Sequence, residues 1–285
     1  MQRYPRGRMR CAAQRAQRYP RGRMMQRYPR GRLRCKSTPE VEMMCETGIK
    51  ICGMRRKEDI EAANACRPDY IGFILSPGFR RSVTPEAAEL LARRLAPGIL
   101  KVGVFVNESV EKVVSAAGFL DLIQLHGKED NAYIRDLRGR LMTTNDPRGR
   151  LLIQAFRIRC ANDLKRAMES EADYLLLDNG TGTGEAFDWS LIRDAEALKR
   201  GAAARPWILA GGLGPDNVAE AVRRFRPFAV DLSSGAETDG WKDPEKMARC
   251  VQAVREAGRE GASTRRSRCP EADLENSAVS MFRRH

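Results

Sequence analysis

From residue 49 onward, short runs of apolar residues alternate with longer stretches in which apolar positions recur at helical spacing. The short runs are rich in β-branched residues and contain few polar positions, which is typical of strands covered on both faces in a parallel sheet. Eight such runs predict eight strands, at 49–52, 70–75, 100–106, 122–125, 151–158, 174–177, 207–210 and 229–232.

Helices are predicted in the intervals between these strands. Thr84 can cap a helix whose first position is Pro85, because the threonine oxygen accepts a free backbone N–H and the fixed φ of proline suits that position. Further helices are predicted to begin at 107–108, at 188–190 with an end near 200, at 215–216, and at about 244 with an end near 257.

Eight strands alternating with helices across residues 48–257 predict an α/β fold, a (β/α)8 TIM barrel. An open, doubly wound sheet also alternates strands with helices and is the competing architecture. Two features favour the barrel. The number of predicted strands is eight. Polar, glycine-bearing turns also follow the strands, at the ends where barrel active sites lie.

The two ends of the chain lack this alternation of apolar runs and helical patterns. The unit Gln-Arg-Tyr-Pro-Arg-Gly-Arg occurs three times within the first 32 residues and has no apolar face. Residues 1–47 are therefore predicted to be a disordered basic extension, and residues 258–285 a short polar tail. The alternative for the repeats is an arm that binds RNA or anionic lipid through its charge, with tyrosines available for stacking.

Charge is distributed unevenly along the chain. There are 51 Lys and Arg against 37 Asp and Glu, for a formal net charge of +14. The first 48 residues contain 13 basic and 3 acidic residues, whereas residues 49–257 contain 32 basic and 30 acidic ones. A nearly neutral body argues that the protein requires no nucleic acid. The absence of any stretch of about 18 apolar residues argues against a membrane span.

The cysteines do not form a framework. Eight of them are scattered without a Cys-x-x-Cys pair, and one of only two histidines is the terminal residue. Zinc sites need close ligand pairs, and disulfide scaffolds are usually shorter chains. We therefore expect a cytoplasmic protein with no metal site.

Small residues follow the last two predicted strands. Gly211 and Gly212 come after the seventh strand, and Ser234 and Gly235 come after the eighth. Barrels of this kind often hold a phosphate in these two loops. Glycine lets backbone N–H groups approach the anion closely, and serine adds a hydroxyl donor. The four residues are expected to bind phosphate, with tight turn geometry alone as the alternative.

Two further strand ends carry titratable groups. Cys52 is the last residue of the first strand, where a thiolate favoured by the nearby Lys50 could act as a base. Asp178 directly follows the sixth strand, where partial burial would suit it to general-acid work. The alternatives are a small buried residue for Cys52 and a helix cap or turn former for Asp178.

His126 and a pair of arginines complete the candidate site. His126 closes the fourth strand, and Arg80 and Arg81 follow the second. An arginine in this place could hold a substrate carboxylate through two hydrogen bonds. The alternative is an exposed arginine with no partner.

These segments together resemble the phosphoribosylanthranilate isomerase family. The resemblance runs from about Lys50 to Glu256 and depends on seven blocks in order. They are KICG at 50–53, VGVFVN at 102–107, QLHG at 124–127, LD at 177–178, TGTG at 181–184 with FDW at 187–189, GGL at 211–213, and RPFAVD at 226–231 running into SSG at 233–235.

The resemblance implies an Amadori rearrangement in tryptophan biosynthesis. It implies Asp178 as the general acid on the furanose ring oxygen and Cys52 as the general base that removes the C2′ proton. Arg81 aligns with the family arginine that holds the anthranilate carboxylate, and the turns after strands seven and eight align with its phosphate site. No cofactor is implied. The expected partner is a small phosphorylated substrate, and the expected state is a monomer or homodimer.

Two departures from the family pattern lie inside the resembling region. Thr181 replaces the first glycine of the usual Gly-Gly-Thr-Gly, which could stiffen a lid without touching a catalytic group. Arg-Gly-Arg recurs at 138–140 and 148–150, which predicts a loop insertion on the barrel face opposite the active site.

Two other functions remain as alternatives. One is a related phosphate-binding barrel isomerase that acts on another phosphoribosyl substrate, such as the histidine-pathway sugar isomerase. That enzyme uses a pair of aspartates, whereas the first strand here ends in Cys52. A non-enzymatic protein whose basic arm binds nucleic acid is disfavoured by the nearly neutral body and by the acid–base pair.

Overall fold

The computed structural model describes residues 46–143, 150–178 and 205–266, with side chains as far as 260. The repeats of the basic extension, the end of the expected insertion at 144–149, and the expected helix at 188–200 lie outside the described residues.

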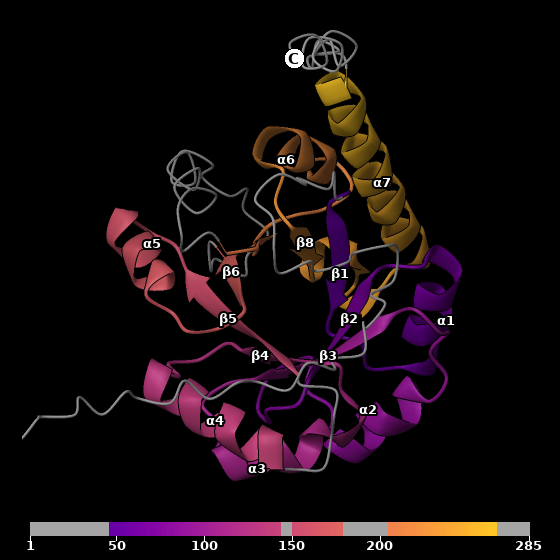
Figure 1. Cartoon of the computed structure of the whole chain (residues 1–285). Coiled ribbons are helices and arrows are strands. Elements are labelled where there is room, and N and C mark those ends of the chain that lie inside the picture. The colour runs from indigo at the N-terminus through magenta and orange to yellow at the C-terminus, as the bar shows by residue number, and fades with distance from the viewer. Residues whose placement is uncertain (1–45, 144–149, 179–204, 267–285) are drawn as a thin grey trace, which may run out of the picture. The chain divides into compact units, whose positions relative to one another are not determined.

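Eight parallel strands form a closed barrel in which each strand pairs with its sequence neighbours and β1 pairs with β8 (Figure 1). The strands are β1 Gly48–Cys52, β2 Tyr70–Ile74, β3 Leu100–Phe105, β4 Leu122–Leu125, β5 Leu151–Arg157, β6 Tyr174–Asp178, β7 Trp207–Ala210 and β8 Ala229–Leu232. All eight predicted strands are confirmed to within one residue at each end, and closure excludes the open sheet.

The described helices form a ring outside the strands (Figure 1). They are α1 Lys57–Cys66, α2 Pro85–Ala92, α3 Val110–Ala116, α4 Asn131–Thr143, α5 Ala161–Met168, α6 Val218–Phe225 and α7 Pro244–Arg266. The predicted cap of α2 is confirmed, because the Thr84 side chain accepts a hydrogen bond from the backbone N–H of Ala87. The predicted starts of two other helices are two or three residues early. Ser109, not Asn107, caps α3, and the side chain of Asn217 closes a turn onto Gly214 before α6 begins.

The prediction of a loop from residue 138 is wrong for its first part. Residues up to Thr143 continue α4, whose Leu137 and Leu141 are buried against the barrel. Arg138 pairs with Asp173 at 3.0 Å, and Arg140 pairs with Glu111 and, one turn back, Asp136. Apolar positions four apart and these ion pairs favour a helix over the single Gly139.

The final helix also differs from the prediction. α7 begins at Pro244 as expected but continues to Arg266, past the predicted end near 257. Its inner face buries Met247, Val251 and Val254. A two-stranded hairpin that the sequence pattern does not predict, β9 Glu237–Thr238 and β10 Trp241–Lys242, connects β8 to this helix.

The core has two layers. A large cluster lies between the strands and the surrounding helices, and a second cluster fills the barrel interior with residues such as Val102, Ile153, Leu176 and Ile208. The interior is therefore packed rather than hollow, as in other (β/α)8 barrels. Polar side chains are brought together at the carboxyl ends of the strands, where the candidate site lies.

Candidate active site

The first cluster of the site joins β1 to β8. Lys50 and Asp231 are opposite each other in the strand pairing, and Lys50 Nζ lies 2.9 Å from Asp231 Oδ2. Both side chains are buried, with exposed fractions of 1% and 8%. The charge of Lys50 also acts on the Cys52 side chain, two residues along the same face of β1. One buried ammonium therefore interacts with both the thiol and the carboxylate.

Gly72 of β2 makes room for this cluster. A Cβ atom at this position would lie 2.7 Å from Cys52 Sγ and 3.2 Å from Lys50 Nζ. Any larger residue would displace the thiol, because atoms approach this closely only at a steric cost. Sequence reasoning missed Gly72, since a glycine inside a strand is visible but the residue beside it on the neighbouring strand is not.

Burial and charge act on the cysteine in opposite directions. Burial raises the pKa of the Cys52 thiol above its ordinary value of 9.0, while the Lys50 ammonium acts to lower that pKa. Burial also acts to lower the pKa of Lys50, but Asp231 and Cys52 outweigh it, so that this pKa is raised and the amine stays protonated. A thiolate formed here is a strong base held beside a permanent cation.

A second cluster lies at the ends of β4 and β6. His126 Nε2 is 3.7 Å from Asp178 Oδ2, and the amide nitrogen of Gln124 donates to His126 Nδ1 at 3.0 Å. The other ring nitrogen, Nε2, is the one that faces the carboxyl group. Gln124 is fully buried, so it fixes the orientation of a ring that is itself partly exposed.

The third cluster surrounds one carboxylate of the β9–β10 hairpin. Glu237 accepts hydrogen bonds from Arg81 Nε at 2.6 Å and Nη2 at 2.9 Å, from Arg80 Nη2 at 2.7 Å, and from Lys242 Nζ at 2.8 Å. Burial acts to raise the pKa of Glu237, but its hydrogen bonds and charge interactions with these cations hold the pKa at about 2. Arg81 is therefore paired, which excludes the interpretation that it is a free surface arginine.

Arg81 also lies against the loop that follows the candidate base. A Cβ atom at Gly53, which has φ of 90°, would lie 2.5 Å from the Arg81 side chain. Lys242 contributes to the same region, because it donates to the carbonyl of Ser233 at 2.8 Å and its charge acts to lower the pKa of Cys52. Arg81, in the loop after β2, therefore lies against the residue that follows Cys52 of β1.

The turns after β7 and β8 meet, as the sequence suggested. Gly211 and Gly212 have φ of 92° and 62°, conformations that side chains rarely adopt. A Cβ atom at Gly235 would lie 2.0 Å from the carbonyl oxygen of Leu213, so the two backbones are in contact. Glycines on both sides let the two backbones come close together, which suits such turns to bind an anion through N–H groups.

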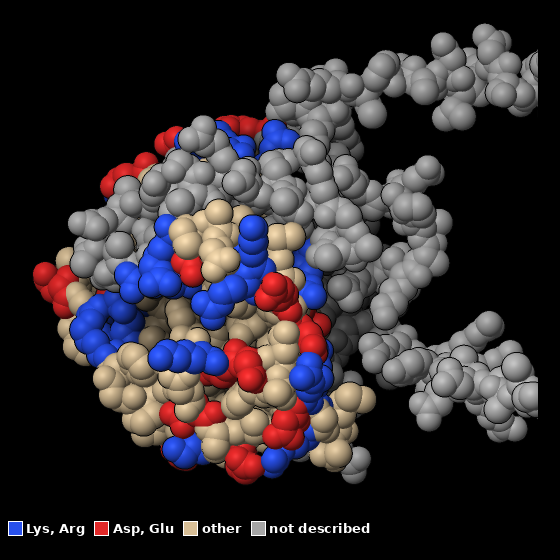
Figure 2. Space-filling model, turned by 90° about the vertical axis from the view of Figure 1, so that its left-hand side faces the viewer, with Lys and Arg blue, Asp and Glu red and all other residues tan. Residues whose placement is uncertain are grey.

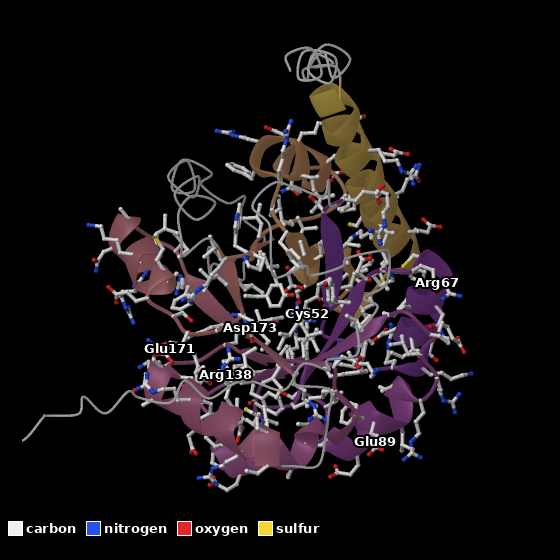
Figure 3. All side chains as sticks on the ribbon, in the orientation of Figure 1. Cys52, Arg67, Glu89, Arg138, Glu171 and Asp173 are labelled. Atoms are coloured by element: carbon white, nitrogen blue, oxygen red, sulfur yellow. The ribbon has the colours of Figure 1, made fainter. Side chains whose placement is uncertain are left out.

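Figure 3 shows Cys52 near the centre of the ring of helices, whereas Arg67 and Glu89 lie at its periphery. Charge interactions link Asp231 to His126 and Asp178, and Cys52 to Lys50 and Lys242. The predicted residues Cys52, His126, Asp178 and Arg81 therefore belong to one end of the barrel. The segment at 181–184 lies outside the described residues.

Sequence reasoning missed Asp231 and Glu237. A signal for Asp231 was present, because an acidic and a basic residue each interrupt an apolar strand, and strands one and eight are neighbours in any closed barrel. No comparable signal marks Glu237, whose partner Arg81 is 156 residues away in the sequence.

The described surface carries both signs of charge. Figure 2 shows basic and acidic side chains interspersed on the face that is turned toward the viewer, rather than one continuous basic patch. In the described ranges, no helix is long and apolar enough to cross a membrane. No cluster of three or more potential metal ligands occurs in the same ranges.

Comparison with known proteins gives a consistent answer. A family model described as N-(5'phosphoribosyl)anthranilate (PRA) isomerase matches residues 49–253. The N-(5'-phosphoribosyl)anthranilate isomerase of Caldanaerobacter subterraneus subsp. tengcongensis is 44% identical over 214 residues, which cover 73% of this chain and 97% of that relative.

Solved structures are similar over the same region. Phosphoribosyl anthranilate isomerase from Thermotoga maritima is 34% identical, with a TM-score of 0.64, over 74% of this chain and 99% of that one. Monomers generated from that dimeric enzyme have also been solved. A further isomerase, in complex with reduced 1-(o-carboxyphenylamino)-1-deoxyribulose 5-phosphate, is 33% identical, with a TM-score of 0.62 and the same coverage.

Proposed function

The chain belongs to the N-(5'-phosphoribosyl)anthranilate isomerase family, and we propose that Cys52 and Asp178 are the base and the acid of its reaction. The reaction is the Amadori rearrangement of N-(5-phospho-β-D-ribosyl)anthranilate to 1-(2-carboxyphenylamino)-1-deoxy-D-ribulose 5-phosphate. It is the third step from chorismate to L-tryptophan and interconverts an aldose and a ketose.

The acid step opens the sugar ring. Asp178 in its protonated form donates to the furanose oxygen, the C1′–O bond breaks, and the anilino nitrogen stabilises the resulting cation as an iminium. His126, 3.7 Å away, orients this carboxyl group and compensates the charge that it gains on losing its proton. The carboxyl group is only partly exposed, so the transfer takes place largely out of bulk water.

The base step removes the proton from C2′. The Cys52 thiolate takes this proton, and the electron pair of the C2′–H bond neutralises the iminium to form an enolamine. A proton added at C1′ and one lost from the C2′ hydroxyl then give the ketone. Substrate and product have the same atoms and the same overall oxidation state, so the reaction needs no cofactor.

The remaining residues position the substrate. Arg81 is proposed to bind the anthranilate carboxylate, a role that its fixed orientation against Glu237 supports. The turns with Gly211, Gly212, Ser234 and Gly235 are suited to the phosphate, because their backbones come into contact and tolerate no side chain at Gly235. A cytoplasmic location and a monomeric or dimeric state remain predictions, and the relative from Thermotoga maritima is dimeric.

One observation carries the assignment of the base. Lys50 is a buried ammonium whose charge acts to lower the pKa of the Cys52 thiol, and a Cβ atom at Gly72 would touch both Lys50 Nζ and Cys52 Sγ, so the two groups line the same space. A cation beside the thiol favours the thiolate inside an apolar barrel.

A substrate deuterated at C2′ tests the assignment. If Cys52 removes this hydrogen in the slow step, the wild-type turnover falls several-fold with the deuterated substrate. The Cys52→Ser variant, a much weaker base, is then expected to be far slower and to keep a full isotope effect. Wild-type turnover by the Cys52→Ala variant would remove the cysteine from the mechanism.

A further inference from the structure

In Asp231, one carboxylate oxygen accepts a hydrogen bond and the other has no partner among the described residues. Its Oδ2 accepts a hydrogen bond from Lys50 Nζ at 2.9 Å. Its Oδ1 is buried and has no hydrogen-bond partner among the residues that the structure describes. The side chain as a whole is only 8% exposed. Buried polar atoms are almost always paired, and an unpaired one is costly, so this oxygen calls for a partner beyond the described residues.

The position of Asp231 indicates where such a partner would come from. The residue is the penultimate one of β8, at the end of the barrel that holds the site. It interacts electrostatically with His126, Asp178 and Cys52. Asp231 therefore belongs to the same group of side chains as the proposed acid and the proposed base, where the substrate must be.

The chemistry of the substrate limits the possible partners. A carboxylate oxygen beside an ammonium accepts hydrogen bonds and repels anions, so the phosphate and the anthranilate carboxylate are excluded as partners. The anilino N–H already has an acceptor in the ortho carboxylate of its own ring. The donors that remain are the ribose hydroxyl groups on C2′ and C3′. C2′ is also the carbon from which Cys52 is proposed to remove a proton.

We propose that Asp231 contacts the substrate directly, with Oδ1 accepting a hydrogen bond from the C2′ or C3′ hydroxyl while Lys50 holds Oδ2. This inference depends on the proposed function, since it needs a ribosyl substrate in this end of the barrel. Because the charge of Lys50 also acts on Cys52, the same ammonium lies beside both the hydroxyl acceptor and the base. The hydroxyl contact then sets the position of the C2′ hydrogen relative to the thiolate.

The test is a double-mutant-type cycle that compares binding affinities when the Asp231 carboxylate, one sugar hydroxyl group, or both are removed. The probes are the reduced product, 1-(o-carboxyphenylamino)-1-deoxyribulose 5-phosphate with its ketone reduced, and the same compound lacking the hydroxyl on C2 or on C3. Each is titrated calorimetrically into the full-length wild type and into the Asp231→Asn and Asp231→Ser variants. Asp121→Asn is the matched control, because Asp121 also pairs with a lysine, Lys101, but at the opposite end of the strands.

The wild type is expected to lose about tenfold to 100-fold in affinity with one of the two deoxy compounds, the usual cost of a hydrogen bond to a charged group. The Asp231 variants are expected to bind the reduced product more weakly by a similar factor and to discriminate much less against that deoxy compound. The Asp121→Asn variant is expected to behave as the wild type does.

Each contrary result has a distinct meaning. If the wild type binds the reduced product but neither deoxy compound binds more weakly, the inference is overturned without any variant, so a variant that does not fold leaves the test decisive. Full discrimination retained in the Asp231→Ser variant also overturns it. A folded wild type that does not bind the reduced product at all contradicts the proposed function instead.

Discussion

Arg81 is held against Glu237 by two nearly parallel hydrogen bonds, from Nε at 2.6 Å and from Nη2 at 2.9 Å. Both bonds use the same edge of the guanidinium group, which fixes its plane and directs the rest of the group away from the carboxylate. Glu237 also accepts hydrogen bonds from Arg80 and Lys242. The carboxylate of Glu237 thus positions the arginine that we propose to bind the carboxylate of the anthranilate group.

The Glu237→Gln variant tests this positioning. A neutral amide cannot accept from three cations, so Arg81 is expected to lose its fixed orientation. The KM for the substrate should rise by about tenfold, the cost of roughly one weakened charge-assisted bond, with a smaller change in kcat. The control is Glu89→Gln, which removes an exposed carboxylate whose partner is Arg93, at the periphery of the barrel. A fall in kcat with an unchanged KM would contradict a role in substrate binding.

Glu237 also predicts a pH dependence of stability. Its pKa is 4.5 ordinarily and about 2 in the folded protein, a difference that corresponds to about 3 kcal/mol. A lowered pKa stabilises the folded state above pH 4.5, and this contribution is lost as the pH falls from 4.5 through about 2. Urea unfolding at a series of pH values should show the Glu237→Gln variant less stable than the wild type at pH 7, with the gap closing in acid. A gap that is constant with pH would show that Glu237 does not titrate in this way.

Lys50 predicts a change in the pH profile of the reaction. Its charge acts to lower the pKa of Cys52, so the Lys50→Gln variant should raise that pKa further, by about one to three units for a close opposite charge. Because the thiolate is the active form, the rising limb of kcat/KM against pH should move to higher pH. The variant should also lose about 3–5 kcal/mol of stability, since Asp231 is left buried without its cation. An unshifted profile in a folded variant would separate Lys50 from the base.

Gly235 predicts a steric limit at the phosphate turns. The Gly235→Ala variant would place a methyl group 2.0 Å from the carbonyl of Leu213, so the two turns must move apart. We expect a loss of about 1–3 kcal/mol in stability and a raised KM. Gly139→Ala is the matched control, because nothing lies within 4 Å of that position on α4. A dephosphorylated substrate analogue should show no difference between Gly235→Ala and wild type, and an equal loss with both substrates would separate Gly235 from the phosphate.

The strands, and the positions of Cys52 and Asp178 at strand ends, were predictable from sequence for one physical reason. Parallel barrel strands are covered on both faces, so a polar residue that ends an apolar run, as Cys52 and Asp178 do, stands out. The α4 region was not predictable from its Arg-Gly-Arg motif. Ion pairs to Asp173 and Glu111 from other parts of the chain support the helix there.

The residues that position the site were harder to predict. Glu237 is in a hairpin with strands of only two residues. Its partner Arg81 comes from the loop after β2, far away in the sequence. Lys50 and Asp231 could have been paired from the sequence once the barrel was assumed, because β1 and β8 must be neighbours when it closes. That Oδ1 of Asp231 has no partner among the described residues is a property of three-dimensional geometry alone.

The most direct test of the account follows the fluorescence of the anthranilate group after freshly made phosphoribosylanthranilate is mixed with the purified full-length protein. The wild type should convert the substrate rapidly, and the Cys52→Ala and Asp178→Asn variants should each be slower by at least about 100-fold, the usual contribution of a general acid or base. A folded wild type that leaves the signal unchanged, or an Asp178→Asn variant as fast as the wild type, would contradict it.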